Sequence, residues 1–214
     1  MTPAETATAP TVGRSILRRW LKPAVFVLCL APLALLIWCG FTNDLSANPV
    51  EFIIRDLGDW ALRFLLVALA VTPVRLVTGW NEVARLRRML GLFAFTYVVL
   101  HLLAYTGLDQ HFDLAGLWND VMKRIYITFG MTAFAILIPL AITSTDAMIR
   151  RLGGARWRAL HRLAYPAGIL AVIHYFLMIK AGYQQPAIYA VVLAALLGIR
   201  FAYRFRTSSA PARR

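Results

Sequence analysis

Histidine is scarce in this sequence, and three of its four copies lie in strongly apolar surroundings. His161 and His174 delimit the segment HRLAYPAGILAVIH, and His101 ends the run RRMLGLFAFTYVVLH. The fourth, His111, lies in the polar segment GLDQHFDLAGLWND, and we expect it to be solvated. An imidazole in an apolar segment can bind a metal, carry a proton or hydrogen-bond to a neighbouring element. Which of these applies depends on the surrounding solvent and on the elements that position each ring.

The composition indicates a membrane protein. The 214 residues are 60% hydrophobic and 15% charged, with a mean hydropathy of +0.64, whereas soluble domains have about 25% charged residues. A helix needs about 20 apolar residues to cross a bilayer. Six blocks approach that length, at 23–41, 57–77, 89–106, 125–142, 159–180 and 186–205. We therefore expect an all-α polytopic bundle of six transmembrane helices over 14–206, between a disordered N-terminal tail (1–13) and a C-terminal tail (207–214).

The formal net charge is +13, and the placement of the charged residues along the chain indicates the membrane topology. Basic residues gather at both ends and in every second connection: Arg14, Arg18, Arg19, Lys22, Arg75, Arg85, Arg87, Arg88, Arg150, Arg151, Arg156, Arg158, Arg200, Arg204, Arg206, Arg213 and Arg214. Most acidic residues lie in the other connections: Asp44, Glu51, Asp56, Asp109, Asp113 and Asp120. Loops rich in Lys and Arg stay cytoplasmic. The pattern therefore predicts cytoplasmic termini and argues against nucleic-acid binding.

This topology sets the depth of each histidine. The helices at 89–106 and 159–180 both run outward, so His101 and His174 reach similar depths near the outer face, while His161 lies about 20 Å closer to the cytoplasm. Three interpretations of the pair stay open on these grounds. The rings hydrogen-bond to neighbouring helices, or they form a bis-histidine haem site with apolar walls, or they relay protons. A relay would need mid-membrane carboxylates, and Asp59 and Asp146 are both expected near helix ends.

Several segments resemble one bacterial family. The runs RRMLGLFAFTYVVLH (87–101), KRIYITFGMTAFAILIPLAITST (123–145), RRLGGARWRALHRLAYPAGILAVIHY (150–175) and GDWALRFLLVALAVTPVRL (58–76) are similar to the MsrQ (YedZ) family. That family forms the haem-binding membrane subunit of the periplasmic protein-methionine-sulfoxide reductase system. It belongs to the ferric-reductase-like transmembrane superfamily, and the resemblance extends over nearly the whole chain.

The resemblance implies a function in electron transfer. Electrons would pass from the quinone pool, or from a cytoplasmic flavin reductase, through haem b in the bacterial inner membrane. They would then reach a separate periplasmic molybdenum-cofactor subunit that reduces methionine sulfoxide in oxidised proteins. The family's haem-linked histidines match His101, His161 and His174. FMN is a further cofactor implied by the resemblance alone, and no short motif marks its contacts.

Two departures from the wider superfamily bear on this prediction. Members that bind two haems carry a second histidine about four turns inward of His101, where this chain has Arg87 and Arg88. We therefore expect one haem on His101 and His174, and a second haem near His161 would need a different ligand. Ile125 stands where the family pattern leads us to expect proline.

Two other functions remain alternatives. A self-contained transmembrane metalloreductase would carry a flavin and NADPH domain after the last helix, and only TSSAPARR follows Arg206 in this sequence. We therefore expect an electron-transfer subunit with no substrate-reducing site of its own. In a cofactor-free transporter or assembly protein, the histidines would serve packing only.

Overall fold

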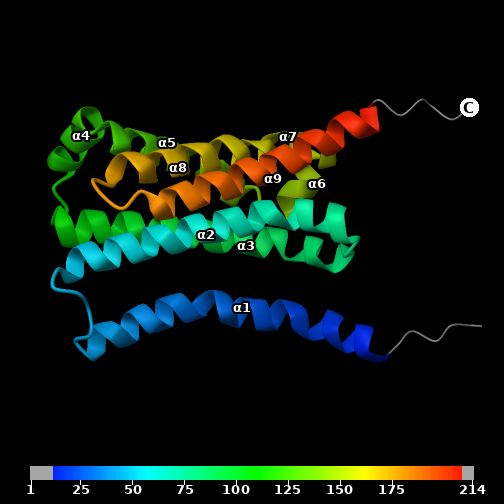
Figure 1. Ribbon diagram of the computed structural model, residues 1–214, viewed down its shortest axis with the longest axis horizontal. Helices are drawn as coiled ribbons and strands as arrows, with labels where there is room; N and C mark the ends of the chain where they lie inside the picture. The colour runs from blue at the N-terminus through cyan, green and yellow to red at the C-terminus, as the bar shows by residue number, and fades with distance from the viewer. Residues whose placement is uncertain (1–11, 209–214) are drawn as a thin grey trace, which may run out of the picture.

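A computed structural model describes residues 12–208, which are mostly helical and contain no strand (Figure 1). The helices are α1 (Val12–Phe41), α2 (Pro49–Thr78), α3 (Arg87–Ala104), α4 (Leu114–Lys123), α5 (Ile125–Ile142), α6 (Asp146–Leu152), α7 (Gly154–Leu160), α8 (Ala164–Met178) and α9 (Gln184–Ser208). Shorter 3-10 or π turns are η1 (Asn81–Arg85), η2 (Tyr105–Asp109) and η3 (His161–Leu163). Residues 1–11 and 209–214, which hold most of the two expected tails, lie outside the described residues.

Within residues 12–208, five helical segments are long and apolar enough to cross a membrane. They are Arg19–Phe41, Pro49–Thr78, Arg87–Asp109, Ile125–Ile142 and Gln184–Phe205. The expected all-α membrane bundle is confirmed, with five such spans by this measure where the sequence predicted six. The difference lies at 159–180, which is divided among α7, η3 and the 15-residue α8. The division falls just before Pro166, which has no N–H to continue a helical ladder but is tolerated in a helix's first turn.

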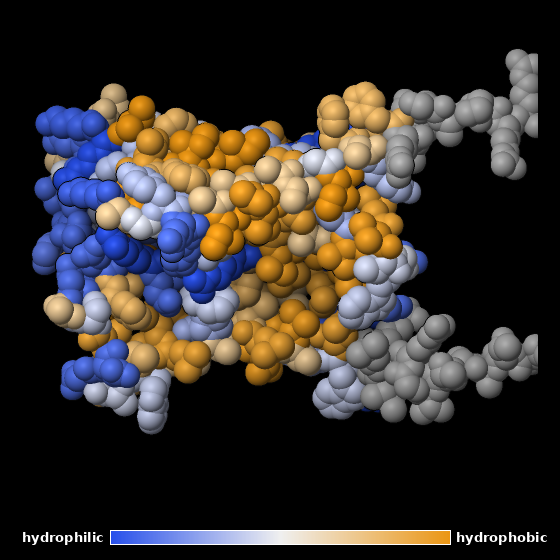
Figure 2. Space-filling view, viewed as in Figure 1, coloured by the Kyte–Doolittle hydropathy of each residue, from blue (hydrophilic) through white to orange (hydrophobic). Residues whose placement is uncertain are grey.

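The long helices run alternately in opposite directions. In Figure 1, α1, α3 and α8 run one way, and α2, α5 and α9 run the other way. The closest packing is between α2 and α3 and between α5 and α8. Figure 2 shows apolar side chains over the middle of one face and hydrophilic side chains gathered at the end where α2 begins. The first residues of α1 and the last residues of α9 both lie at the opposite end, on opposite sides of the bundle (Figure 1).

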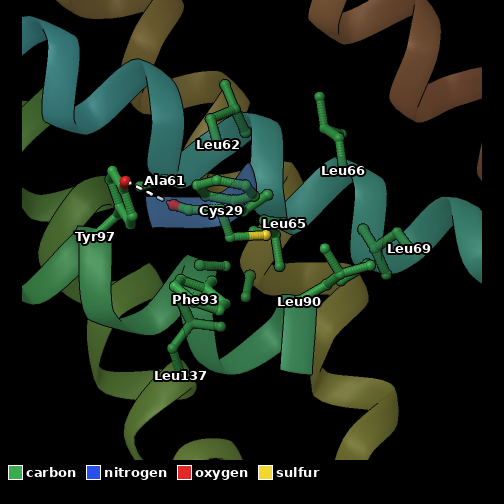
Figure 3. Packing of buried hydrophobic residues seen from close by; sticks show 14 of the residues in the cluster. Cys29, Ala61, Leu62, Leu65, Leu66, Leu69, Leu90, Phe93, Tyr97 and Leu137 are labelled. Atoms are coloured by element: carbon green, nitrogen blue, oxygen red, sulfur yellow. Dashed lines mark hydrogen bonds between the residues drawn. The ribbon is translucent and has the colours of Figure 1, made fainter. Parts of the chain in front are cut away.

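Helix α1 packs less closely on the other helices than they do on one another, and one buried side chain of α3 hydrogen-bonds to its backbone. The Tyr97 hydroxyl donates to the carbonyl of Cys29 at 2.9 Å and accepts from the backbone N–H of Leu33 at 3.1 Å (Figure 3). Cys29 and Leu33 are four residues apart, so the hydroxyl is inserted into one rung of the α1 hydrogen-bond ladder. Pro32 lies beside this rung, and proline and inserted groups are recognised causes of helix bending.

A buried arginine links α2, α8 and α9. Pro73 has no N–H, so the carbonyl of Leu69, four residues earlier in α2, lacks its usual helical donor. Arg200 supplies one through Nη2, and its Nη1 donates to the Tyr165 hydroxyl at 2.5 Å. Only 9% of Arg200 is exposed. The charge pattern predicted this arginine among the basic residues of one membrane face, whereas in the structure it lies inside the bundle as a hydrogen-bond donor.

Candidate functional site

His101 and His174 meet inside the bundle. Each lies about one turn before the end of its helix, His101 on α3 and His174 on α8. Their ring centroids are 6.4 Å apart and the ring planes are at 80°. The structure thus brings together the two histidines that the sequence placed at one depth on two helices running in the same direction.

Each of the two rings is held from behind by a backbone carbonyl. Nδ1 of His101 lies 2.8 Å from the carbonyl oxygen of Ile54 on α2, and Nδ1 of His174 lies 2.6 Å from that of Tyr126 on α5. A carbonyl oxygen only accepts hydrogen bonds, so Nδ1 carries the proton and Nε2 keeps its lone pair. Metal-binding histidines commonly have this arrangement, in which the second nitrogen donates to a carbonyl and fixes the ring.

A glycine lies behind each ring, one helical turn after the accepting carbonyl. A Cβ atom added to Gly58 on α2 would lie 3.0 Å from Nδ1 of His101. A Cβ atom added to Gly130 on α5 would lie 2.9 Å from Nδ1 of His174. Both imidazoles therefore occupy space that any other residue's side chain would take. The two half-sites are built alike, although they come from different helix pairs.

The two rings line a cavity of about 710 Å³ between the helices. Its walls inside the bundle are apolar and include Leu62, Leu65, Val98, Phe134 and Leu137. Charged side chains line another part of it: Glu51, Arg55, Asp59, Asp109 and Lys180. The volume is within the range of about 300–1,000 Å³ typical of small-molecule and cofactor sites.

The separation of the rings suits one metal ion between them. Two metal–imidazole bonds of about 2 Å each, on opposite sides of one ion, place the ring centroids about 6 Å apart. The observed 6.4 Å agrees with this value. Within residues 12–208 no group of three or more His, Cys, Asp or Glu gathers as a metal site. The pair therefore suits a metal whose remaining ligands come from a larger group, as in a bis-histidine haem.

Asp59 lies beside this cavity, and its expected position near a helix end is wrong. Helix α2 begins at Pro49, eight residues before the predicted span, which places Asp59 in its third turn. The early start has a local cause, because the Asn48 side chain accepts from the backbone N–H of Glu51 and proline is favoured in the first helical position. Asn48 followed by Pro49 was the sequence signal for this start.

The Asp59 carboxylate belongs to a polar network, of which Asp59 and Gln185 line the cavity. It lies 3.6 Å from a guanidinium nitrogen of Arg63 and accepts from Gln185 at 3.1 Å. Arg63 donates through Nε to the Tyr189 hydroxyl at 2.7 Å. These contacts join α2 to α9, and none of the four residues was a candidate site residue in the sequence analysis.

His161 has different surroundings and does not line the cavity. Its Nε2 lies 3.1 Å from the Thr143 hydroxyl, and its ring stacks on Trp157 with centroids 4.0 Å apart. The indole of Trp157 also donates to the Thr143 carbonyl at 2.9 Å. Arg87 is close enough for its charge to act on His161. The remaining histidine, His111, is exposed, as expected.

The fold and the paired histidines are those of a helical membrane protein with a histidine-lined cavity, and sequence comparison identifies the family. The family described as ferric reductase like transmembrane component matches residues 57–172, from α2 into α8. A Rhodospirillum rubrum protein is 55% identical over 194 residues, covering 88% of this chain and 92% of its own length. A Caulobacter vibrioides protein is 49% identical over 185 residues, covering 86% and 88%. Both are named protein-methionine-sulfoxide reductase heme-binding subunit MsrQ. The chain belongs to the MsrQ family.

Proposed function

We propose that this chain binds haem b between His101 and His174 and carries electrons across the bacterial inner membrane. The observation that carries this proposal is the matched pair of half-sites, each with a carbonyl-anchored imidazole over a glycine. The names of the relatives, which call those proteins heme-binding subunits, support it independently. The apolar cavity walls and a donor set of two imidazoles fit a haem with histidine on both faces.

The residues of this chain would act mainly by holding the site rigid. When bound, the haem supplies reversible one-electron chemistry at its iron. The carbonyls of Ile54 and Tyr126 keep Nδ1 protonated and aim Nε2 at the space between the helices. The apolar walls keep water from the centre of the cavity. Because every part is supplied by packed helices, the geometry need not change between redox states.

We propose six membrane crossings with both termini in the cytoplasm. The beginning of α1 and the end of α9 lie at the same end of the bundle (Figure 1). This supports an even number of crossings, with α7, η3 and α8 together making the fifth. The distribution of basic residues supports the direction. A reporter active only in the cytoplasm should work when fused to the C-terminus, and a reporter active only in the periplasm should fail there. The reverse result would place His101 and His174 near the cytoplasmic face.

The proposed electron path has a donor and an acceptor outside this chain. Electrons would come from the quinone pool or a cytoplasmic flavin reductase, with FMN as a second cofactor. They would pass to a periplasmic molybdenum-cofactor methionine sulfoxide reductase that repairs oxidised proteins. The relatives' names support the link to methionine sulfoxide reduction.

We place docking of this acceptor on the outer loops at 42–56 and 107–122. Helix α4 in the second of these presents three exposed apolar side chains at four-residue spacing, Leu114, Trp118 and Met122. Such a stripe on one helical face suits either a partner or the membrane surface. Trp118→Ala should slow electron delivery to the added acceptor subunit, while its reduction by dithionite should stay unchanged. A variant that delivers electrons to the acceptor as fast as the wild type would place the docking site elsewhere.

A reduced-minus-oxidised optical spectrum of the purified full-length chain tests the haem proposal. A sharp b-type α-band is expected. A preparation with no such band after expression with ample haem would favour a cofactor-free membrane protein. Reduction of ferric chelates by the purified chain with NADPH alone would favour a self-contained metalloreductase.

A further inference from the structure

The structure contains a second cavity, away from the histidine pair, where α1 approaches α3. It has a volume of about 410 Å³. The residues that line it are Lys22, Phe26, Arg85, Arg88, Met89, Leu92, Phe93 and Thr96. We call it the α1–α3 groove.

The α1–α3 groove is basic at one end and apolar along its length. Lys22 lies near the beginning of the first span, and Arg88 is the second residue of α3. Since α1 and α3 run in the same direction (Figure 1), these cations lie at one level, where a membrane helix meets the headgroups. Met89 directly follows Arg88, and Phe26, Leu92 and Phe93 lie about one turn deeper. Phe26 packs edge-on against Phe93, with centroids 5.2 Å apart, between the two helices.

The charges at the basic end are only partly balanced by the described residues. Arg88 forms an ion pair with Asp146, and Arg85 lies 3.3 Å from a Glu82 carboxylate oxygen. Lys22 adds a third cation, and its charge acts on the same Asp146. Three cations therefore face two carboxylates, so that one positive charge remains for an anion.

We propose that the α1–α3 groove binds an anionic phospholipid. The phosphodiester would lie at Lys22 and Arg88, and one acyl chain would follow Met89, Leu92 and Thr96 into the membrane. Charge complementarity and the change from basic to apolar with depth select this occupant. Basic pockets between transmembrane helices are known to bind anionic headgroups. The lipid would fill the space beside the Tyr97 contact and stabilise α1 on the bundle.

Native mass spectrometry of the detergent-purified full-length chain tests this proposal. The probes are phosphatidylglycerol, phosphatidylcholine with the same acyl chains, and glycerol 3-phosphate. Phosphatidylglycerol adducts should survive higher collision energy than phosphatidylcholine adducts, and glycerol 3-phosphate alone should not bind. Equal retention of the two lipids would overturn the proposal. Binding of glycerol 3-phosphate alone would indicate a site for a soluble anion, and dimers in place of lipid adducts would indicate a second copy of the chain.

Matched variants separate the groove from general surface charge. Lys22→Gln should weaken phosphatidylglycerol binding about fivefold, the effect of one cation near a lipid surface. Arg156→Gln removes an exposed cation outside the groove and should change little. Equal loss in these two variants would mean that binding is not local.

A second pair of variants tests the apolar part without changing charge. Leu92→Trp fills the groove and should lower phosphatidylglycerol retention, whereas Leu103→Trp, at an exposed position elsewhere on α3, should not. The thermal stability gained on adding phosphatidylglycerol should fall in Leu92→Trp only, because a ligand stabilises the state that binds it. Unchanged retention in Leu92→Trp would exclude the groove as the lipid site.

Discussion

The two ends of the segment HRLAYPAGILAVIH carry the same residue type in unlike surroundings. At one end, His174 faces a second imidazole, and its Nδ1 is bonded to a carbonyl, so Nε2 is left for a ligand. At the other end, His161 faces a tryptophan ring, and its Nε2 is already bonded to a threonine hydroxyl. The comparison shows that the presence of a histidine does not by itself mark a ligand site. What separates a ligand site from a packing site is which ring nitrogen is already hydrogen-bonded and which is left free for a ligand.

His161 also differs from His101 and His174 in the backbone support of its ring. The His101 and His174 rings each occupy space over a glycine. Within the described residues His161 has no comparable glycine beneath its ring; it packs against the Trp157 side chain instead. A ring over backbone is held by atoms that cannot move aside, whereas a ring over a side chain can shift with it. The rings of His101 and His174 are thus better fixed than that of His161.

Alanine substitution of each histidine should give the largest contrast between the two ends. His101→Ala or His174→Ala removes one axial ligand, so the low-spin haem spectrum should be lost or become high-spin. His161→Ala should keep the low-spin spectrum but slow reduction by quinol or by a flavin reductase. Optical spectra and stopped-flow reduction of the three variants provide the measurement.

The reverse pattern would contradict this assignment. If His161→Ala abolished the low-spin signal while His174→Ala kept it, the ligand pair would have to be reassigned. Total protein and helix content, measured by circular dichroism, control for variants that fail to fold.

Replacing Gly58 or Gly130 should have a smaller effect on haem binding, confined to the site of His101 and His174. In Gly130→Ala the new methyl group would lie 2.9 Å from Nδ1 of His174, and in Gly58→Ala 3.0 Å from that of His101. Either ring would have to move, and loss of such supporting geometry typically weakens metal binding about 10–100-fold. Haem titration of the apo-protein measures this loss.

Gly91 on α3 is the matched control, since a Cβ atom there meets nothing within 4 Å. Gly91→Ala should bind haem as the wild type does. Equal behaviour of Gly91→Ala and Gly130→Ala would show that the glycines do not shape the site.

The smallest expected effect is at His161. Thr143→Val removes the hydroxyl that bonds to Nε2 of His161, and we expect a loss of about 1 kcal/mol in stability with no change in the haem spectrum. Thr132→Val on α5, the helix that ends just before Thr143, is the control, because its hydroxyl bonds to the backbone of its own helix. A spectrum altered by Thr143→Val alone would tie His161 to the cofactor site.

Hydropathy predicted most of the fold because long apolar blocks have few alternatives in a membrane. The block at 125–142 coincides with α5. The early start of α2 was missed because hydropathy does not register the capping signal at Asn48 and Pro49. The short helices α4, α6 and α7 were missed because polar connections carry no comparable signal.

The candidate site was predictable only in part. Depth and direction alone predicted that His101 and His174 share one level. The supporting groups were not predictable, because Ile54 and Tyr126 contribute carbonyls that every residue possesses. Only packing between helices selects which carbonyl lies behind which ring. Gly58 and Gly130 were visible in the sequence, but their role in leaving room for an imidazole can be recognised only once the neighbouring helix is known.

The Tyr97 contact can form only later in the synthesis of the membrane-spanning region than α1 itself. Tyr97 follows Cys29 by 68 residues, so at about 5–20 residues per second it leaves the ribosome about 3–14 s later. Until then the Leu33 N–H can bond directly to the Cys29 carbonyl, so that α1 keeps this rung of its ladder while it lies in lipid. The hydrogen-bonded contact of α1 with Tyr97 therefore waits for α3, although α1 also packs against α2, which is made earlier.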